Sequence, residues 1–272
     1  MATVIAVANQ KGGVGKTTTS IEIAAALHNE GKKVLLIDMD QQGNLSTYVG
    51  ANLDTEEVVE NKKTKSIRTI PTIRELLLGE AGIEEAIQKL DICDVITSSP
   101  ELSKADKEFT DVEDVYLLQD LLEYVQDTYD YIVIDNSPSR NTLLIMAYIA
   151  ADKIIVPTEC DEGSLNGIQA ICTDVNQLRS GRRKLTNAII DGIILTKKEN
   201  TVLHDIALET IDELIQEIAA LQDNIVPFVG VIRKGIEASE CKTAGQSLQQ
   251  YKKYGNLATD YRKIASMILE KE

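Results

Sequence analysis

The residues best suited to chemistry lie in one short stretch near the N-terminus, residues 9–19, with the sequence NQKGGVGKTTT. Its three glycines let backbone N–H groups turn inward, because no Cβ atom obstructs the turn. Lys16 and Thr17 then place a cation and a hydroxyl at the start of a helical pattern. This combination is typical of a phosphate-binding loop, with the lysine on the β- and γ-phosphates and the threonine on Mg²⁺.

The loop departs from the general pattern G-x-x-x-x-G-K-[ST] at its first position, where Gln10 stands in place of glycine and is followed by a second lysine, Lys11. The stretch resembles the deviant Walker A loop, K-G-G-x-G-K-T, of the ParA/MinD family of P-loop ATPases. In that family the extra lysine crosses a dimer interface to the partner's nucleotide, and the resemblance implies the same role for Lys11. The alternative, a glycine turn without a ligand, explains neither lysine.

Two further acidic segments follow apolar runs that predict buried strands. Asp38 and Asp40 begin the segment DMDQQGN, which resembles the family motif D-x-D-P-Q-G-N, with Gln41 in the place of proline. Asp135 ends the run YIVID, a Walker B pattern whose carboxylate is suited to hold Mg²⁺ through water. Ligands gather at the carboxyl ends of parallel strands, so both segments are candidates for one site. Strand-capping and turn formation are the alternative.

The resemblance assigns roles to individual residues. It implies that ATP or ADP with Mg²⁺ is the cofactor and that Asp40 helps position the attacking water. Arg233 stands near the end of a strand that resembles the family's [VI]-P-R segment at the adenine pocket, with Ile232 in the place of proline. The predicted catalytic residues are Lys11, Lys16 and Asp40; the nucleotide-binding residues are Lys11, Gly12, Gly13, Val14, Gly15, Lys16, Thr17, Thr18 and Arg233; the metal ligands are Thr17, Asp38 and Asp135.

The elements that position these residues alternate between strand and helix along the chain. This alternation predicts an α/β fold, a doubly wound and mostly parallel sheet with helices on both faces, as in P-loop NTPases. We expect a single domain over residues 1–272, with a polar surface excursion at about 51–70. The predicted strands are 4–8, 33–38, 92–97, 131–135, 153–158, 188–196 and 226–233, and the predicted helices are 17–29, 72–78, 83–90, 115–125, 164–178, 203–221 and 257–269.

Composition limits the possible partners. The formal net charge of −15 argues against a general nucleic-acid coat, but residues 179–272 carry 14 basic and 13 acidic side chains and are nearly neutral. The best candidate for nonspecific contact with double-stranded DNA is the basic cluster Arg179, Arg182, Arg183 and Lys184. The sequence has no apolar run long enough for a membrane span and no signal-peptide pattern, so we expect a cytoplasmic protein.

Family resemblance supplies the functional hypothesis. It implies a DNA-partitioning ATPase that dimerises with ATP, associates with the nucleoid in that state, and hydrolyses ATP slowly until a ParB-like adaptor stimulates it. A MinD-like positioning ATPase, which docks on membranes through a basic C-terminal helix, is the main alternative; here the chain ends short and acidic. A metal-cluster carrier lacks the paired cysteines it needs, and an ATP-using synthetase has no motif in its favour.

Overall fold

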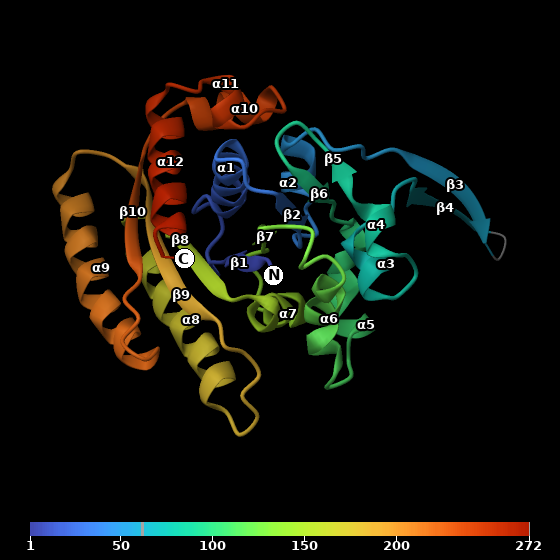
Figure 1. Cartoon of the computed structure of the whole chain (residues 1–272), viewed down its shortest axis with the longest axis horizontal. Helices are drawn as coiled ribbons and strands as arrows, with labels where there is room; N and C mark the ends of the chain where they lie inside the picture. Colours follow the sequence, from blue (N-terminus) through green and yellow to red (C-terminus); the bar gives the residue numbers. More distant parts are fainter. Residues whose placement is uncertain (61–62, 272) are drawn as a thin grey trace.

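An eight-stranded sheet organises the chain in the computed structural model, which describes residues 1–60 and 63–271. The strand order is β10-β9-β8-β1-β7-β2-β6-β5, and every neighbouring pair is parallel except β5 and β6. With helices on both sides of this sheet, the predicted doubly wound fold is confirmed (Figure 1). The strands are β1 (Thr3–Val7), β2 (Val34–Asp38), β5 (Gln88–Lys89), β6 (Asp94–Ile96), β7 (Tyr131–Asp135), β8 (Lys153–Thr158), β9 (Ile189–Lys198) and β10 (Phe228–Arg233).

The helices form two layers that bury both faces of the sheet. In β1, Ile5 and Val7 point into the core beneath α1 (Lys16–Asn29) and α12 (Asn256–Leu269), whereas Val4 and Ala6 point into the core on the other face. Strands buried on both faces must be apolar throughout, which is why short apolar runs mark them in the sequence. The other helices are α2 (Asn44–Tyr48), α3 (Ile73–Leu77), α4 (Ile83–Ala86), α5 (Ala105–Glu108), α6 (Leu117–Glu123), α7 (Thr142–Ala150), α8 (Glu162–Ser180), α9 (Val202–Leu221), α10 (Glu237–Thr243) and α11 (Leu248–Tyr251), with 3₁₀ turns η1 (Pro100–Lys104) and η2 (Asp114–Tyr116).

The order of the strands places the phosphate-binding loop at the centre of the sheet. From β1 the chain passes to β2, β5 and β6 on one side, returns to β7 beside β1, and then continues to β8, β9 and β10 on the other side. Ligand sites of open α/β sheets lie at the carboxyl ends of the strands where the winding reverses. The ends of β1, β2 and β7 meet at that position.

The surface excursion at 51–70 is more regular than the sequence predicts. Instead of a loop, it contains an antiparallel hairpin of β3 (Thr55–Glu60) and β4 (Lys63–Arg68). The hairpin projects from the end of the molecule opposite α9 (Figure 1). Asn61 and Lys62, which belong to the predicted excursion, lie outside the described residues.

Several helices differ from the sequence prediction. The helix expected over 83–90 ends at Ala86, because Gln88 and Lys89 pair with β6 and so become a strand. The sequence prediction also omits α7, whose mostly apolar residues give no helical period, and the short helices α2, α5, α10 and α11.

Candidate functional site

The glycine loop between β1 and α1 adopts the curled conformation that an anion needs. Gly13 and Gly15 have φ values of +83° and +91°, in the left-handed region that side chains disfavour. Gly15 is the N-cap of α1, so it supplies no side-chain cap to the first N–H groups of the helix, and the first turn holds no acidic residue. These N–H groups and the positive end of the helix dipole are therefore available to a phosphate.

The two loop lysines have different surroundings. Lys16 is only 7 % exposed, and its Nζ donates to the carbonyl oxygen of Lys11 at 2.9 Å. Burial lowers the pKa of Lys16, and the nearby carboxylates of Asp135 and Asp40 oppose that shift. The side chain of Lys11 is 37 % exposed and pairs with Asp161 at 2.5 Å and with the Ser164 hydroxyl at 3.0 Å, both near the start of α8. Lys16 thus lies inside the loop and Lys11 outside it.

Asp135 carries a carboxylate oxygen that meets no donor in hydrogen-bond geometry. Its Oδ1 accepts from the Ser20 hydroxyl at 2.8 Å, whereas the buried Oδ2 is without a partner. Burial raises the pKa of Asp135 to about 7; neighbouring Asp38 raises it further, and the Thr17 hydroxyl is among the groups that lower it. An unpaired oxygen of this kind is costly unless a cation or a water occupies it.

Asp38 is the register partner of Asp135 on the neighbouring strand β2. Burial raises its pKa to about 6, although three donors hold the carboxylate: the N–H of Asp40 at 3.1 Å, and the N–H and hydroxyl of Ser46 at 2.9 and 2.7 Å. Most of its lone pairs are therefore used to fix the segment after β2, and Asp38 has fewer of them left for a cation than Asp135 has.

Asp40 is held within the same turn. Its Oδ1 accepts from the N–H of Gln42 at 3.0 Å, and its carbonyl oxygen accepts from the Ser98 hydroxyl. Ser98 also donates its N–H to the Ser46 hydroxyl at 3.1 Å, so the turn after β6 supports the turn after β2. The structure thereby brings Lys16, Asp38, Asp40 and Asp135 to one edge of the sheet.

Several contacts around the loop have no signal in the sequence. Gln10 donates to Asp174 of α8 at 3.0 Å, and Arg140, in the loop after β7, pairs with the other oxygen of Asp174 at 2.7 Å. At the end of β9, the Thr196 hydroxyl lies 2.9 Å from the carbonyls of both Val14 and Thr158 and can donate its one hydrogen to either. Each contact joins segments far apart in the chain, so residue spacing cannot reveal it.

Arg233, predicted at the adenine pocket, has a structural partner. Its guanidinium forms a two-pronged ion pair with Asp260 of α12, at 2.8 and 2.7 Å, and also donates to the carbonyl of Asn256 at 3.1 Å. The ion pair fixes α12 against the end of β10.

The predicted DNA-binding residues lie in and near the loop between α8 and β9. This loop precedes β9, so it lies at the edge of the sheet opposite the phosphate loop. Arg179 is committed to the fold, with bonds to the carbonyls of Asn187 and Ala188 and an ion pair with Asp223. The cluster's other three members, Arg182, Arg183 and Lys184, are exposed.

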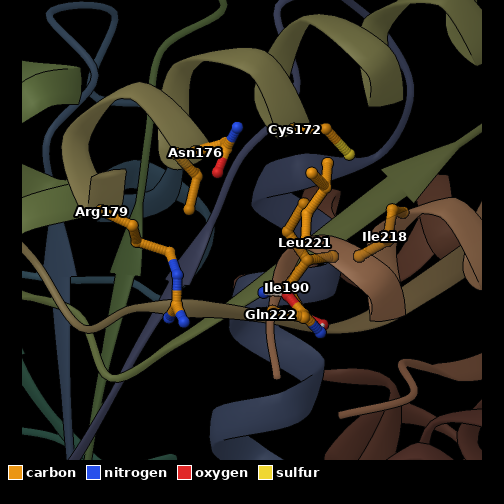
Figure 2. Close-up of a pocket in the computed structure, with 8 residues that line it drawn as sticks. Cys172, Asn176, Arg179, Ile190, Ile218, Leu221 and Gln222 are labelled. Carbon is orange, nitrogen blue, oxygen red and sulfur yellow. Dashed lines mark hydrogen bonds between the residues drawn. The ribbon is translucent and has the colours of Figure 1, made fainter. Parts of the chain in front are cut away.

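A small cavity lies between α8 and α9, away from the phosphate loop (Figure 2). Its volume of about 10 Å³ is close to the minimum for one water molecule. Most of its lining is apolar, and the polar groups of Arg179 and Gln222 are bonded to backbone atoms. It therefore offers no chemistry comparable to that of the glycine loop.

The edge formed by β1, β2 and β7 fits a nucleotide with its magnesium ion. The uncapped helix and loop N–H groups suit phosphates, and the unpaired Oδ2 of Asp135 suits a cation. Within residues 1–60 and 63–271, no three His, Cys, Asp or Glu side chains converge as ligands. A site with so few protein ligands suits Mg²⁺, which commonly binds one or two carboxylates and completes its coordination shell with water and phosphate.

Known proteins resemble the chain over nearly its whole length. Residues 2–191 match the family AAA_31, described as an AAA domain. The chromosome-partitioning ATPase Soj of Treponema pallidum is 30% identical over 267 residues, 97% of this chain and 96% of that protein. The chromosome partitioning protein ParA of Caulobacter vibrioides is 30% identical over 274 residues, 99% and 94% of the two chains.

A solved structure supports the fold. Cobyrinic acid a,c-diamide synthase from Mycobacterium smegmatis, with bound ADP and magnesium, matches with a TM-score of 0.77 at 24% identity, covering 99% of this chain and 94% of that one. At that identity the likeness concerns the fold alone. The matched family, the two partitioning relatives and the deviant loop agree, and the chain belongs to the ParA/Soj family of partitioning ATPases.

Proposed function

We propose that this partitioning ATPase is a switch in which two copies close over ATP and Mg²⁺, bind double-stranded DNA without sequence preference, and separate after slow hydrolysis. A ParB-like adaptor stimulates that hydrolysis, and the ATP-bound form resides on the nucleoid in the cytoplasm. The observation that carries the proposal is the contrast between buried Lys16 and outward-lying Lys11. A single chain needs only Lys16 for its own phosphates, which leaves Lys11 for a partner's nucleotide.

The chain's own residues perform most of the proposed chemistry. The N–H groups of residues 12–18 and the Nζ of Lys16 hold the phosphates, after Lys16 releases the carbonyl of Lys11. Thr17 and Asp135 would hold Mg²⁺ with Asp38 beside them, and the bound ion would supply positive charge to the phosphates. Asp40, fixed by Gln42, orients the attacking water. Arg233 shapes the base side of the site by holding α12 in place.

Dimerisation is tested by measuring molecular mass with and without ATP on Asp40→Ala, in which hydrolysis is blocked. We expect a monomer without nucleotide and a dimer with ATP. Lys11→Ala in the same background is the matched variant, and it should retain nucleotide binding but stay monomeric. A nucleotide-bound Asp40→Ala protein that remains monomeric contradicts the switch.

DNA binding is tested with random duplex DNA across a range of salt concentrations. Each phosphate contact that is lost reduces the slope of log K against log salt by roughly 0.9. The exposed residues of the α8–β9 loop predict that Arg182→Ala/Arg183→Ala weakens ATP-dependent binding and reduces this slope, whereas Lys107→Ala on α5 does neither. Binding that is absent at low salt, or indifferent to the double substitution, contradicts this assignment.

The membrane-positioning alternative has less support. No helix in the described part of the chain has the length and apolar character to cross a bilayer. The apolar side of α12 is also occupied, because Leu257, Tyr261, Ile264 and Ile268 are buried in the core beside α1. We therefore expect no ATP-dependent sedimentation with anionic liposomes.

A further inference from the structure

Three backbone carbonyls of the phosphate loop accept hydrogen bonds from side chains. Lys16 donates to the carbonyl of Lys11, Lys197 to that of Gly13, and Thr196 to that of Val14, each at 2.9 Å. A peptide group is planar and trans, so its C=O and the N–H of the next residue point in opposite directions. A carbonyl fixed outward therefore fixes the following N–H inward, toward the place of a phosphate.

Lys197 reaches the loop through an irregular strand end. Leu195 of β9 pairs with Val231 and Lys198 pairs with Arg233, so two residues of β9 lie opposite one residue of β10. This is a β-bulge, a feature that redirects a side chain and occurs often beside active sites. Lys197 has a φ of +54°, in the left-handed region where a lysine is strained.

The side chain of Lys197 is aimed by a second contact. Its Nζ pairs with Glu159, which follows β8, at 2.7 Å while it donates to Gly13. Lys198, the next residue, turns away to Asp205 and the carbonyl of Glu199. Of these adjacent lysines, Lys197 thus bonds to the phosphate loop, and Lys198 supplies a matched control.

We propose that Lys197 is a positioning residue for the nucleotide: it holds the carbonyl of Gly13 outward and thereby presents the N–H of Val14 to the phosphates. The inference rests on the proposed function, since it assumes that the loop binds ATP and ADP. Buried Thr196, on the same bulge, does the same for the N–H of Gly15 when its single hydroxyl hydrogen bonds to the carbonyl of Val14 and not to that of Thr158, which is equally near. Lys16 must break its bond to the carbonyl of Lys11 to reach a phosphate, whereas Lys197 and Thr196 can keep their bonds to the loop.

The test separates affinity from stability by substituting a residue that accepts a left-handed φ. Lys197→Gly relieves the backbone strain but removes the bond to Gly13. We expect its melting temperature without nucleotide to equal or exceed that of the wild type, while the Kd for a fluorescent ADP rises about fivefold, as for loss of a partly exposed charged hydrogen bond. Lys197→Arg should restore the affinity, and Lys198→Met should leave it unchanged.

Two further measurements complete the test. The effect of Lys197→Gly should persist in 0.5 M salt, because a bond that orients a peptide is not a long-range charge effect. Thr196→Val should also weaken ADP binding. The inference is overturned if Lys197→Gly binds ADP as the wild type does, if the loss disappears in high salt, or if Lys198→Met loses as much. If the wild type itself binds no ADP, the proposed function fails instead.

Discussion

The unpaired oxygen of Asp135 predicts how magnesium affects nucleotide binding. Asparagine has nearly the same shape but no charge, so Asp135→Asn should lose the contribution of the ion. We expect EDTA to weaken ADP binding to the wild type by about tenfold or more and to change binding to the variant hardly at all. ATP turnover by Asp135→Asn should be at least about 100-fold slower than that of the wild type. Titration with fluorescent ADP measures the first effect. Asp127→Asn at an exposed position is the control; equal EDTA sensitivity of wild type and Asp135→Asn contradicts the assignment.

Within one chain, Asp161 forms an ion pair with Lys11, the lysine that in the proposed switch contacts the nucleotide of the partner. Asp161 also caps α8 by accepting from the N–H and hydroxyl of Ser164, at 3.1 and 2.8 Å. Asparagine can still cap the helix but no longer pairs with Lys11. Because a half-exposed ion pair contributes about 0.2–1 kcal/mol, Asp161→Asn should dimerise at an ATP concentration about two- to fivefold lower. Light scattering during ATP titration of the Asp40→Ala background measures this, and an unchanged or higher midpoint shows that Asp161 does not restrain Lys11.

At the scale of elements, the β3–β4 hairpin is a separable addition. Its base is closed by the N–H of Thr69 on the carbonyl of Asp54 at 3.0 Å, so the two ends are already adjacent. Of the hairpin residues whose side chains the structure describes, 55–57 and 66–68, none belongs to either hydrophobic core. Replacing residues 55–68 by Asn-Gly should therefore change the free energy of unfolding by no more than about 1 kcal/mol and leave ADP binding intact. Urea unfolding checks this, and a loss of several kcal/mol would mean that the hairpin supports the fold.

The elements that could be predicted from sequence are those whose pattern is local. Apolar runs predict every strand of the large sheet except β5, because burial on both faces demands apolar residues. The polar hairpin has no such pattern, and its strands exist because they pair with each other. Likewise, the sequence predicts Gln88 and Lys89 as part of a helix, whereas in the structure they form β5 by pairing with β6.

The same distinction applies to the site. The glycine loop, Asp38, Asp40 and Asp135 have signals in the sequence because each ends or closely follows a strand. Lys197 is 184 residues from its partner Gly13, and Ser164 is 153 residues from Lys11, so only the folded chain reveals these pairs. Arg233 shows the converse, since its motif could suggest a base pocket but not its ion pair with Asp260.

For the molecule as a whole, buried carboxyl groups should make the fold less stable as pH rises. Burial raises the pKa of Asp38 to about 6, of Asp135 to about 7 and of Glu22 to about 8. An unfolded chain holds these protons only up to about pH 4. Between the unfolded and the folded pKa values, the folded state binds more protons than the unfolded state. The contribution of these groups to the free energy of unfolding is therefore fully present below about pH 4 and is lost as the pH rises through their folded pKa values.

Glu22 allows this pH dependence to be isolated. It lies on α1 in the core, and its Oε1 accepts from the N–H of Leu248 at 2.7 Å, which ties α11 to the helix of the phosphate loop. Glu22→Gln can keep that bond but has no proton to lose. We expect urea unfolding of the variant to show a flatter pH profile, with its advantage over the wild type growing between pH 5 and 8 by up to about 1.4 kcal/mol per pH unit. Exposed Glu209→Gln is the control, and parallel profiles for wild type and Glu22→Gln would mean that Glu22 stays ionised in the folded protein.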